Sequence, residues 1–136
     1  MSTPDTTVEV AERLYSAFTS HDRAGLAALL HPDFTGRVSE GMPFGLGGAV
    51  HSPEQMLRDV WGGASAHWET APYPDEFVAA GANRVMVLGY YRGRGRTTGR
   101  RYTAAFVHDI TVRDGKIASL TQITDTKAWH DALAAG

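Results

Sequence analysis

The stretch YTAAFVHDITVRDGKIASLTQITD, from Tyr102 to Asp125, decides the fold of this 136-residue chain. From Tyr102 to Arg113 apolar residues recur at every second position, which predicts a strand with one buried face. Asp114-Gly115 follows, and an Asp-Gly pair between two such runs is a strong β-hairpin signal. Lys116 to Asp125 is therefore expected to return as the last strand of an antiparallel sheet.

Two more strands are expected before this hairpin. The first runs from Trp68 to Ala80 and is bent at Pro72 and Pro74. A turn at Gly81-Ala82-Asn83 joins it to a second strand, from Arg84 to Arg92. The second half of the chain thus predicts an antiparallel meander.

Helical periodicity marks the N-terminus. Thr6 and Glu9 have the spacing of a capping box, so a helix is expected to begin with Thr6 as its N-cap. Apolar residues then recur at three- and four-residue steps and define one buried helix face: Val8, Ala11, Tyr15 and Phe18.

Further helices are expected at Arg23–Leu30, stopped by Pro32, and from Ser52 to the pair Gly62-Gly63. The glycine-rich stretch Phe34–Val50 predicts a loop with at most a short strand, and Ala128–Ala134 a short terminal helix. Helices first and strands afterwards indicate an α+β fold, with the helices on one face of a curved sheet, in one domain spanning residues 1–136.

Composition fits an ordinary globular protein, with 43% apolar and 21% charged residues and a net charge of −2. The absence of cysteine excludes disulfides, thiolate catalysis and cysteine-ligated metals. The six histidines lack metal-binding spacing, and no phosphate-binding loop precedes a helix, so neither a metal nor an organic cofactor is expected.

Neither a nucleic acid nor a membrane is expected as a partner. Basic residues concentrate between Arg92 and Arg101, but no aromatic ladder is interleaved, which favours a solvated hairpin tip over a nucleic-acid surface. No apolar run is long enough to span a membrane, and Met1–Glu9 has no features of a secretory signal. A cytoplasmic protein is the expectation.

The order and spacing of several short motifs resemble the SnoaL-like branch of the nuclear transport factor 2-like superfamily. They cover roughly residues 6 to 130, and each is weak alone. The motifs are Glu40–Gly45, Gly89–Gly93, Thr98–Arg100, Phe106–His108, Arg113–Ile117 and Thr124–Thr126. The resemblance implies a cone-shaped α+β barrel around an apolar cavity, proton-transfer chemistry without a cofactor, and dimers formed through the outer face of the sheet.

Three residues are candidates for catalysis. Asp125 ends the last strand and is a candidate general base, or else the cap of the turn that follows. His108 lies on the apolar face of its strand, where it is a proton-transfer group or a buried core histidine. Tyr15, on the apolar face of the first helix, is a donor to a substrate oxygen or a core tyrosine.

Register decides which polar residue accompanies His108. A regular two-residue turn places His108 opposite Thr121 and leaves Asp125 about 13 Å along the strand. A bulge or a longer turn reverses the facing of the last strand, so that Gln122 shares the face of His108. Gln122 is no base, and in that case the aldol cyclase interpretation weakens.

Aromatic side chains are expected to line the cavity and suit a small hydrophobic polycyclic substrate. With Gln122, the candidate substrate contacts are Phe18, Phe44, Trp61, Tyr90 and Phe106.

The resemblance favours a cofactor-independent tailoring enzyme of aromatic polyketide biosynthesis, a hydroxylase or cyclase acting on a polycyclic ketone or phenol. The alternatives are a ketosteroid-isomerase-like or epoxide-hydrolase-like enzyme and a non-catalytic small-ligand-binding module. A homodimer through sheet faces is expected, because Thr103, Ala105, Val107 and Thr111 give the outer strand face a small, weakly polar character.

Overall fold

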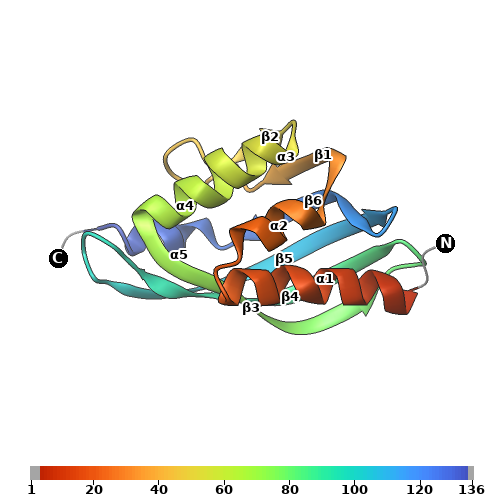
Figure 1. The fold of residues 1–136 in the computed structure, drawn as a ribbon. Coiled ribbons are helices and arrows are strands. Elements are labelled where there is room, and N and C mark those ends of the chain that lie inside the picture. The colour runs from red at the N-terminus through yellow and green to blue at the C-terminus, as the bar shows by residue number, and fades with distance from the viewer. Residues whose placement is uncertain (1–3, 135–136) are drawn as a thin grey trace.

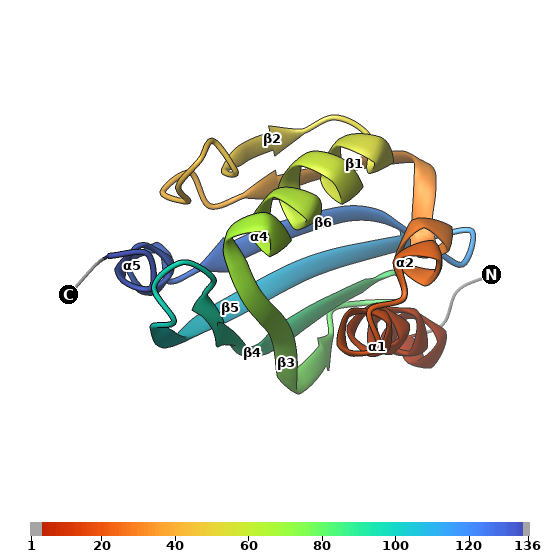
Figure 2. The same cartoon turned by 60° about the vertical axis from the view of Figure 1, so that its left-hand side comes forward.

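The computed structural model describes residues 4–134 and shows the predicted α+β architecture. Figures 1 and 2 show α1, α2 and α4 on the same side of a curved six-stranded sheet. The elements are α1 (Pro4–Thr19), α2 (Arg23–Leu29), β1 (Leu30–Val38), β2 (Gly48–Val50), α3 (Pro53–Gln55), the π-helix η1 (Met56–Trp61), α4 (Gly62–His67), β3 (Trp68–Ala79), β4 (Arg84–Gly95), β5 (Arg101–Arg113), β6 (Lys116–Thr124) and α5 (Thr126–Asp131).

The sheet order is β2-β1-β6-β5-β4-β3. The predicted antiparallel meander from β3 to β6 is confirmed, and the register of β3 shifts after Pro74, where a bend was expected. The sheet is mixed, however, because β1 pairs with β6 in parallel.

The prediction of a loop with at most a short strand over Phe34–Val50 is wrong for its first part, because β1 runs through Val38; residues 39–47 are a loop, and the short strand β2 pairs back onto β1. Gly36, counted as a loop signal, allows a close approach of β1 to β6. A Cβ at this position would lie 2.9 Å from the Leu120 carbonyl oxygen. Glycine within a strand often marks such a backbone contact.

Two predicted helix boundaries are also wrong. The chain is already helical at Pro4, so Thr6 lies inside α1 and is not its N-cap. Gly62-Gly63 does not end the helix that begins at Pro53, since Gly62 has helical angles and its N–H donates to the Leu57 carbonyl. This five-residue step makes η1 a π-helix, and the helical stretch continues to His67.

Glycines on the inner face of β4 permit the strong curvature of the sheet. A Cβ at Gly89 would lie 2.2 Å from the Tyr73 carbonyl oxygen, and one at Gly93 would lie 2.0 Å from that of Glu69. No side chain fits at these two positions while β3 keeps its path. The curvature therefore depends on residues without a side chain.

An aromatic cluster closes one end of the molecule, where α5 packs beside β5 (Figure 2). Trp129 of α5 is buried, and its ring lies edge-on to Trp68 and Tyr91 at centroid distances of 5.0 and 4.8 Å. Its indole N–H donates to Thr124, and the indole of Trp68 donates to the Trp129 carbonyl. These contacts fix α5 against the sheet.

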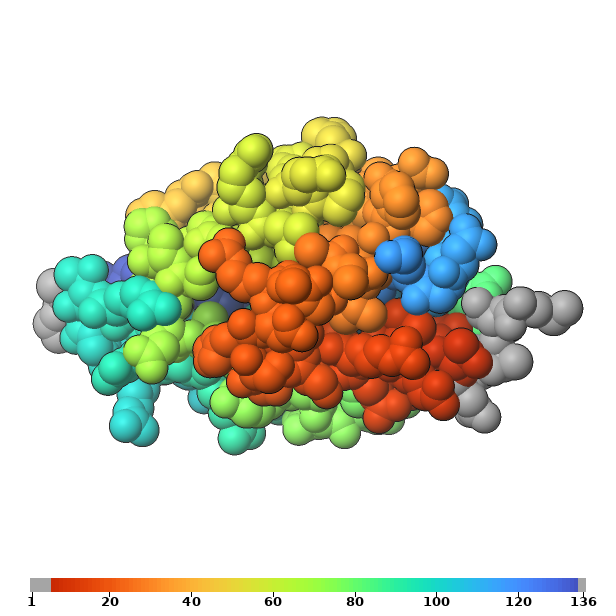
Figure 3. Space-filling view, viewed as in Figure 1, coloured from red at the N-terminus to blue at the C-terminus, as the bar shows by residue number. Residues whose placement is uncertain are grey.

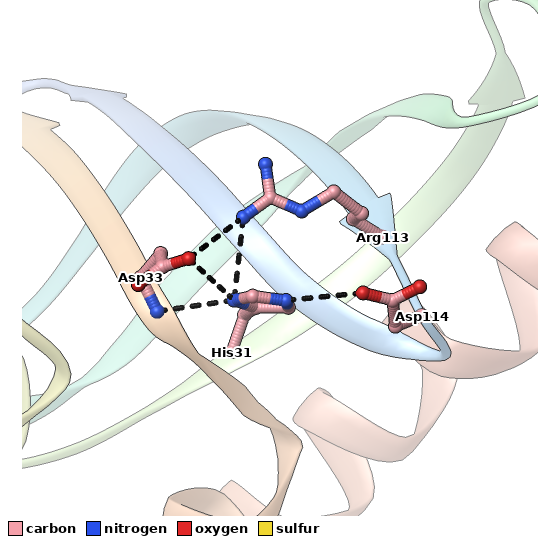
Figure 4. Close-up of polar contacts among 4 residues, drawn as sticks. All are labelled: His31, Asp33, Arg113 and Asp114. Atoms are coloured by element: carbon pink, nitrogen blue, oxygen red, sulfur yellow. Dashed lines mark hydrogen bonds and ion pairs between the residues drawn. The ribbon is translucent and has the colours of Figure 1, made fainter.

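A polar cluster ties the β5–β6 turn to β1, where Figure 4 shows His31 between Asp33, Arg113 and Asp114. The Asp33 backbone N–H donates to Nδ1 of His31 at 3.0 Å, so the imidazole proton is on Nε2 and points to the Asp114 carboxylate at 3.3 Å. Asp114 and Gly115 both have positive φ, as the predicted two-residue hairpin requires. Within residues 4–134, no helix has the length and apolar character needed to cross a bilayer.

Gly93→Ala is expected to destabilise the protein by at least about 2 kcal/mol, because the new methyl overlaps the β3 backbone. Chemical denaturation measures the change. The matched control is Gly81→Ala, where a Cβ meets nothing within 4 Å and only the positive φ is unfavourable, by about 1 kcal/mol. An equal or smaller loss at Gly93 contradicts the role assigned to this glycine.

Candidate functional site

A cavity of about 400 Å³ lies between the helices and the sheet. Figure 3 shows the surface hollowed between the orange α1–α2 segment and the yellow-green atoms of α4. Most of the lining is apolar and comes from α1, η1, α4 and the β1–β2 region. These apolar residues include Ala17, Phe18, Val38, Met42, Leu46, Leu57, Val60 and Trp61.

The floor of the cavity is polar, with Tyr91 of β4 and Gln122 of β6 among its lining residues. The Tyr91 hydroxyl donates a short hydrogen bond to Oε1 of Gln122. Behind this pair lies His108 of β5, with Nε2 at 2.7 Å from the same Oε1 and 3.1 Å from the Tyr91 oxygen. Tyr15 of α1 completes the row, with its hydroxyl 2.7 Å from Nδ1 of His108.

These distances determine where the protons are. An amide oxygen only accepts, so the His108 Nε2 must carry the hydrogen that it shares with Gln122. Nδ1 is then the acceptor, and Tyr15 donates to it. The neutral tautomer of His108 with its hydrogen on Nε2 satisfies both bonds.

Burial explains the same charge state. Desolvation lowers the pKa of His108 to about 4, an effect that the hydrogen bond with Gln122 partly opposes. Burial, and secondarily the proximity of Tyr91, raises the pKa of Tyr15 far above its usual value. Burial also raises the pKa of Tyr91, with a smaller effect of Tyr102. All three groups are held in their neutral forms near pH 7.

A β-bulge brings Gln122 to this position. The register of the β5–β6 hairpin passes over Ala118, so that Thr111 pairs with Ser119 and His108 pairs with Gln122. Of the two registers considered from the sequence, the bulged one is therefore present, and Gln122 faces the cavity.

The amide nitrogen of Gln122 is free to bind a ligand. None of the hydrogen bonds among the described residues uses it, and no fully buried side-chain polar atom there lacks a partner. This nitrogen thus borders open space, on a residue that lines the cavity. The floor presents N–H donors whose direction is set by the two bonds to Oε1.

His21 and Arg23 lie at the mouth, between α1 and α2. Hydrogen bonds from the His21 and Asp22 N–H groups to the Phe18 and Ala17 carbonyls form a Schellman motif. His21 occupies its left-handed position with φ of 56°, which costs a non-glycine residue roughly 1–2 kcal/mol. The motif holds His21 in a fixed backbone conformation at the opening.

The predicted catalytic residues separate into two groups. His108 and Tyr15 lie together, but behind Tyr91 and Gln122 and outside the cavity lining. Asp125 is exposed and does not line the cavity; it stands at the N-cap position of α5 without a side-chain capping bond. The structure thus places Asp125 beside Ala105, whose carbonyl accepts the Asp125 N–H, three positions along β5 from His108, which pairs with Gln122.

Among the predicted substrate contacts, Phe18, Trp61 and Gln122 line the cavity. Phe44 is 59% exposed and stacks on His67, while Tyr90 is 40% exposed on the outer face of β4. Phe106 is buried behind Tyr91 and stacks on His108. Contrary to the prediction, Phe44, Tyr90 and Phe106 therefore do not line the cavity.

Among the lining residues that sequence reasoning missed are three with polar side chains: Tyr91, His21 and Arg23. Tyr91 had a signal, since two-residue alternation from the buried Val85 and Val87 leads to position 91 and not to 90. His21 and Arg23 gave none, because residues of a helix connection follow no periodic pattern. Within residues 4–134 no cluster of three or more His, Asp or Glu side chains is arranged to hold a metal ion.

Stability should fall as the pH drops from about 6.5 to about 4, because the unfolded chain binds a proton that the buried His108 does not. The stabilisation is complete above this range and lost below it. One such proton contributes up to about 1.4 kcal/mol per pH unit to the slope. His108→Gln, which keeps a donor and an acceptor, should have a shallower slope in urea unfolding measured from pH 4 to 7. Equal slopes in the two proteins contradict the neutral, buried His108.

A family model described as the SnoaL-like domain matches residues 11–120. An NTF2-like protein of unknown function from Burkholderia pseudomallei K96243 is 30% identical, with a TM-score of 0.86, 96% of this chain covered and 98% of that one. TerC, which was co-crystallised with polyporic acid, is 28% identical, with a TM-score of 0.84 and coverage of 94% and 98%.

IdmH of Streptomyces antibioticus, proposed to be a polyketide cyclase, is 24% identical with a TM-score of 0.79, over 93% of this chain and 97% of its own; this likeness concerns the fold alone. No curated protein sequence matches the chain. Because the family model matches most of the chain and the folds agree over nearly its whole length, this chain belongs to the SnoaL-like domain family and has an NTF2-like fold.

Proposed function

We propose that this chain is a cofactor-independent tailoring enzyme of aromatic polyketide biosynthesis acting on a polycyclic ketone or phenol, as a hydroxylase in the first place and as a cyclase in the second, because Gln122 and not a carboxylate faces the cavity. The observation that carries the proposal is the free Gln122 amide at the floor of an otherwise apolar cavity. Membership of the SnoaL-like family supports it. So does the similarity to TerC, a protein co-crystallised with polyporic acid.

Both reactions develop negative charge on a substrate oxygen. Removal of a proton from a carbon next to a carbonyl gives an enolate, and removal from a phenol gives a phenolate. An N–H donor that is already oriented and shielded from water stabilises such an oxyanion. Tyr91 and His108 supply that orientation, because both donate to the oxygen of the same amide group.

A non-catalytic ligand-binding module is the second candidate. The observation that favours it is the absence of any aspartate or glutamate from the cavity lining formed by the described residues. Such a module needs the cavity and the donor at its floor but no group that removes a proton. Turnover separates the two functions.

Gln122→Leu is expected to lower kcat on an accepted substrate by about 10²-fold, the usual effect of losing one oxyanion donor. Product formation and oxygen consumption are measured with a panel of polycyclic ketones and phenols, including anthrone and 1-naphthol. The control is Met42→Leu, a change of similar volume in the apolar wall, which should keep most activity. Binding of the panel without product from the wild-type protein contradicts catalysis and favours the binding module.

We also propose that the protein is a homodimer through the outer face of the sheet. That face carries a continuous apolar patch, since Tyr73 pairs with Tyr90, and Val107 lies between Leu88 and Ile123. Ile123 is 61% exposed. A second copy of the same patch buries these side chains on both subunits.

Ile123→Glu should convert the dimer to a monomer, because it places a charge within a buried apolar contact. Light scattering at micromolar concentration gives the mass. Phe44→Glu changes an equally exposed aromatic residue away from the sheet face and should leave the dimer intact. A wild-type mass equal to that of one chain contradicts the proposal.

A further inference from the structure

Most polar groups of the cavity lining are already used inside the protein. The Ser65 hydroxyl donates to the Gly62 carbonyl, and that of Thr70 is bound to Tyr102 and to the Arg92 carbonyl. The Tyr91 hydroxyl donates to Gln122. Besides the indole N–H of Trp61, three lining side chains keep free nitrogen atoms, with no hydrogen bond or ion pair to those atoms from any residue in 4–134: His21, Arg23 and Gln122.

These free groups lie at the floor and at the mouth of the cavity, and all of them carry nitrogen atoms that can donate hydrogen bonds. Gln122 is at the floor and offers amide N–H donors, whereas His21 and Arg23 are at the mouth and offer an imidazole and a guanidinium. No acidic side chain of the described chain lines the cavity to neutralise them. A ligand that satisfies all three groups has a hydrogen-bond acceptor at its inner end and an anion at its outer end.

The carboxylate next to His21 and Arg23 in the sequence is already hydrogen-bonded within the protein. Asp22 stands between His21 and Arg23, but its carboxylate accepts the Gly25 N–H at 2.8 Å as the N-cap of α2 and does not line the cavity. The Schellman motif holds His21 in the left-handed conformation that glycine usually adopts there. A flexible surface loop needs no such strained residue, whereas a binding site gains from its fixed position.

We propose that the cavity binds an aromatic keto acid. Its carbonyl oxygen accepts from Gln122, and its carboxylate binds Arg23 and His21 at the mouth. Its flat ring system packs against Phe18 and Trp61, whose rings meet edge-on at a centroid distance of 4.9 Å in the apolar wall. This substrate class rests on the function proposed above and restricts it to substrates with a free acid group. A guanidinium suits a carboxylate because it donates two parallel N–H bonds.

The test compares two probes that differ only in charge, 9-fluorenone-2-carboxylate and 9-fluorenone-2-carboxamide. Isothermal titration calorimetry gives both dissociation constants at low salt. The wild-type protein should bind the carboxylate about fivefold or more tightly than the amide, and the preference should shrink in 0.5 M salt. Arg23→Gln should remove most of the preference, with a much smaller effect on amide binding than on carboxylate binding. His21→Asn, which tolerates the left-handed conformation, should reduce it.

Arg13→Gln is the matched control, since it removes the same charge from an exposed site on α1 that does not line the cavity. It should keep the full preference. Equal binding of the two probes by the wild-type protein overturns the keto-acid site but not the proposed function, as does an equal loss of preference in Arg13→Gln. If neither probe binds, the keto-acid site is overturned, whereas the proposed function is decided separately by turnover of the ketone and phenol panel. Amide binding that is lost in Gln122→Leu but retained in Arg23→Gln confirms the two ends separately.

Discussion

The β-bulge at Ala118 is the constraint on which the site depends. One extra residue in β6 places Gln122 opposite His108, where a regular hairpin would place Thr121. All the later contacts follow from that pairing: Oε1 of Gln122 takes hydrogens from Tyr91 and His108, and His108 takes one from Tyr15. A single register choice thus converts a polar strand residue into an oriented donor facing an apolar cavity.

The surroundings of the Gln122 amide must meet two opposite requirements: every buried polar group must be paired, and the cavity must stay open. A buried row of four polar side chains is favourable only if every member is paired, and no fully buried side-chain polar atom of the described chain is left unpaired. The curvature that makes room for the cavity needs positions with no side chain, supplied by Gly89 and Gly93. The hydrogen-bonded row holds the Gln122 amide in one orientation, while the glycines keep the space in front of it open.

Local signals in the sequence were sufficient for most of the fold. Asp114-Gly115 and the two-residue alternation before it predicted the β5–β6 hairpin, and the helices before the strands predicted the α+β class. Features that depend on distant partners were not predictable. Strand β1 forms because the edge of β6 is available to it, and Gly62 stays helical because Leu57 accepts its N–H.

Prediction of the site failed for similar reasons. Which of Gln122 and Asp125 faces inward is decided by the bulge, which leaves no mark in the periodicity of β6. Tyr91, by contrast, was within reach of a strict count along β4. As for η1, a π-turn contains one residue more than an α-turn, so the Gly62–Leu57 hydrogen bond takes up one extra residue within a helical stretch that continues to His67. Leu57, Val60 and Trp61 of this turn line the cavity, so a one-residue deletion here changes the cavity wall and leaves the floor on the sheet untouched, which gives evolution a one-codon route to new ligand specificity.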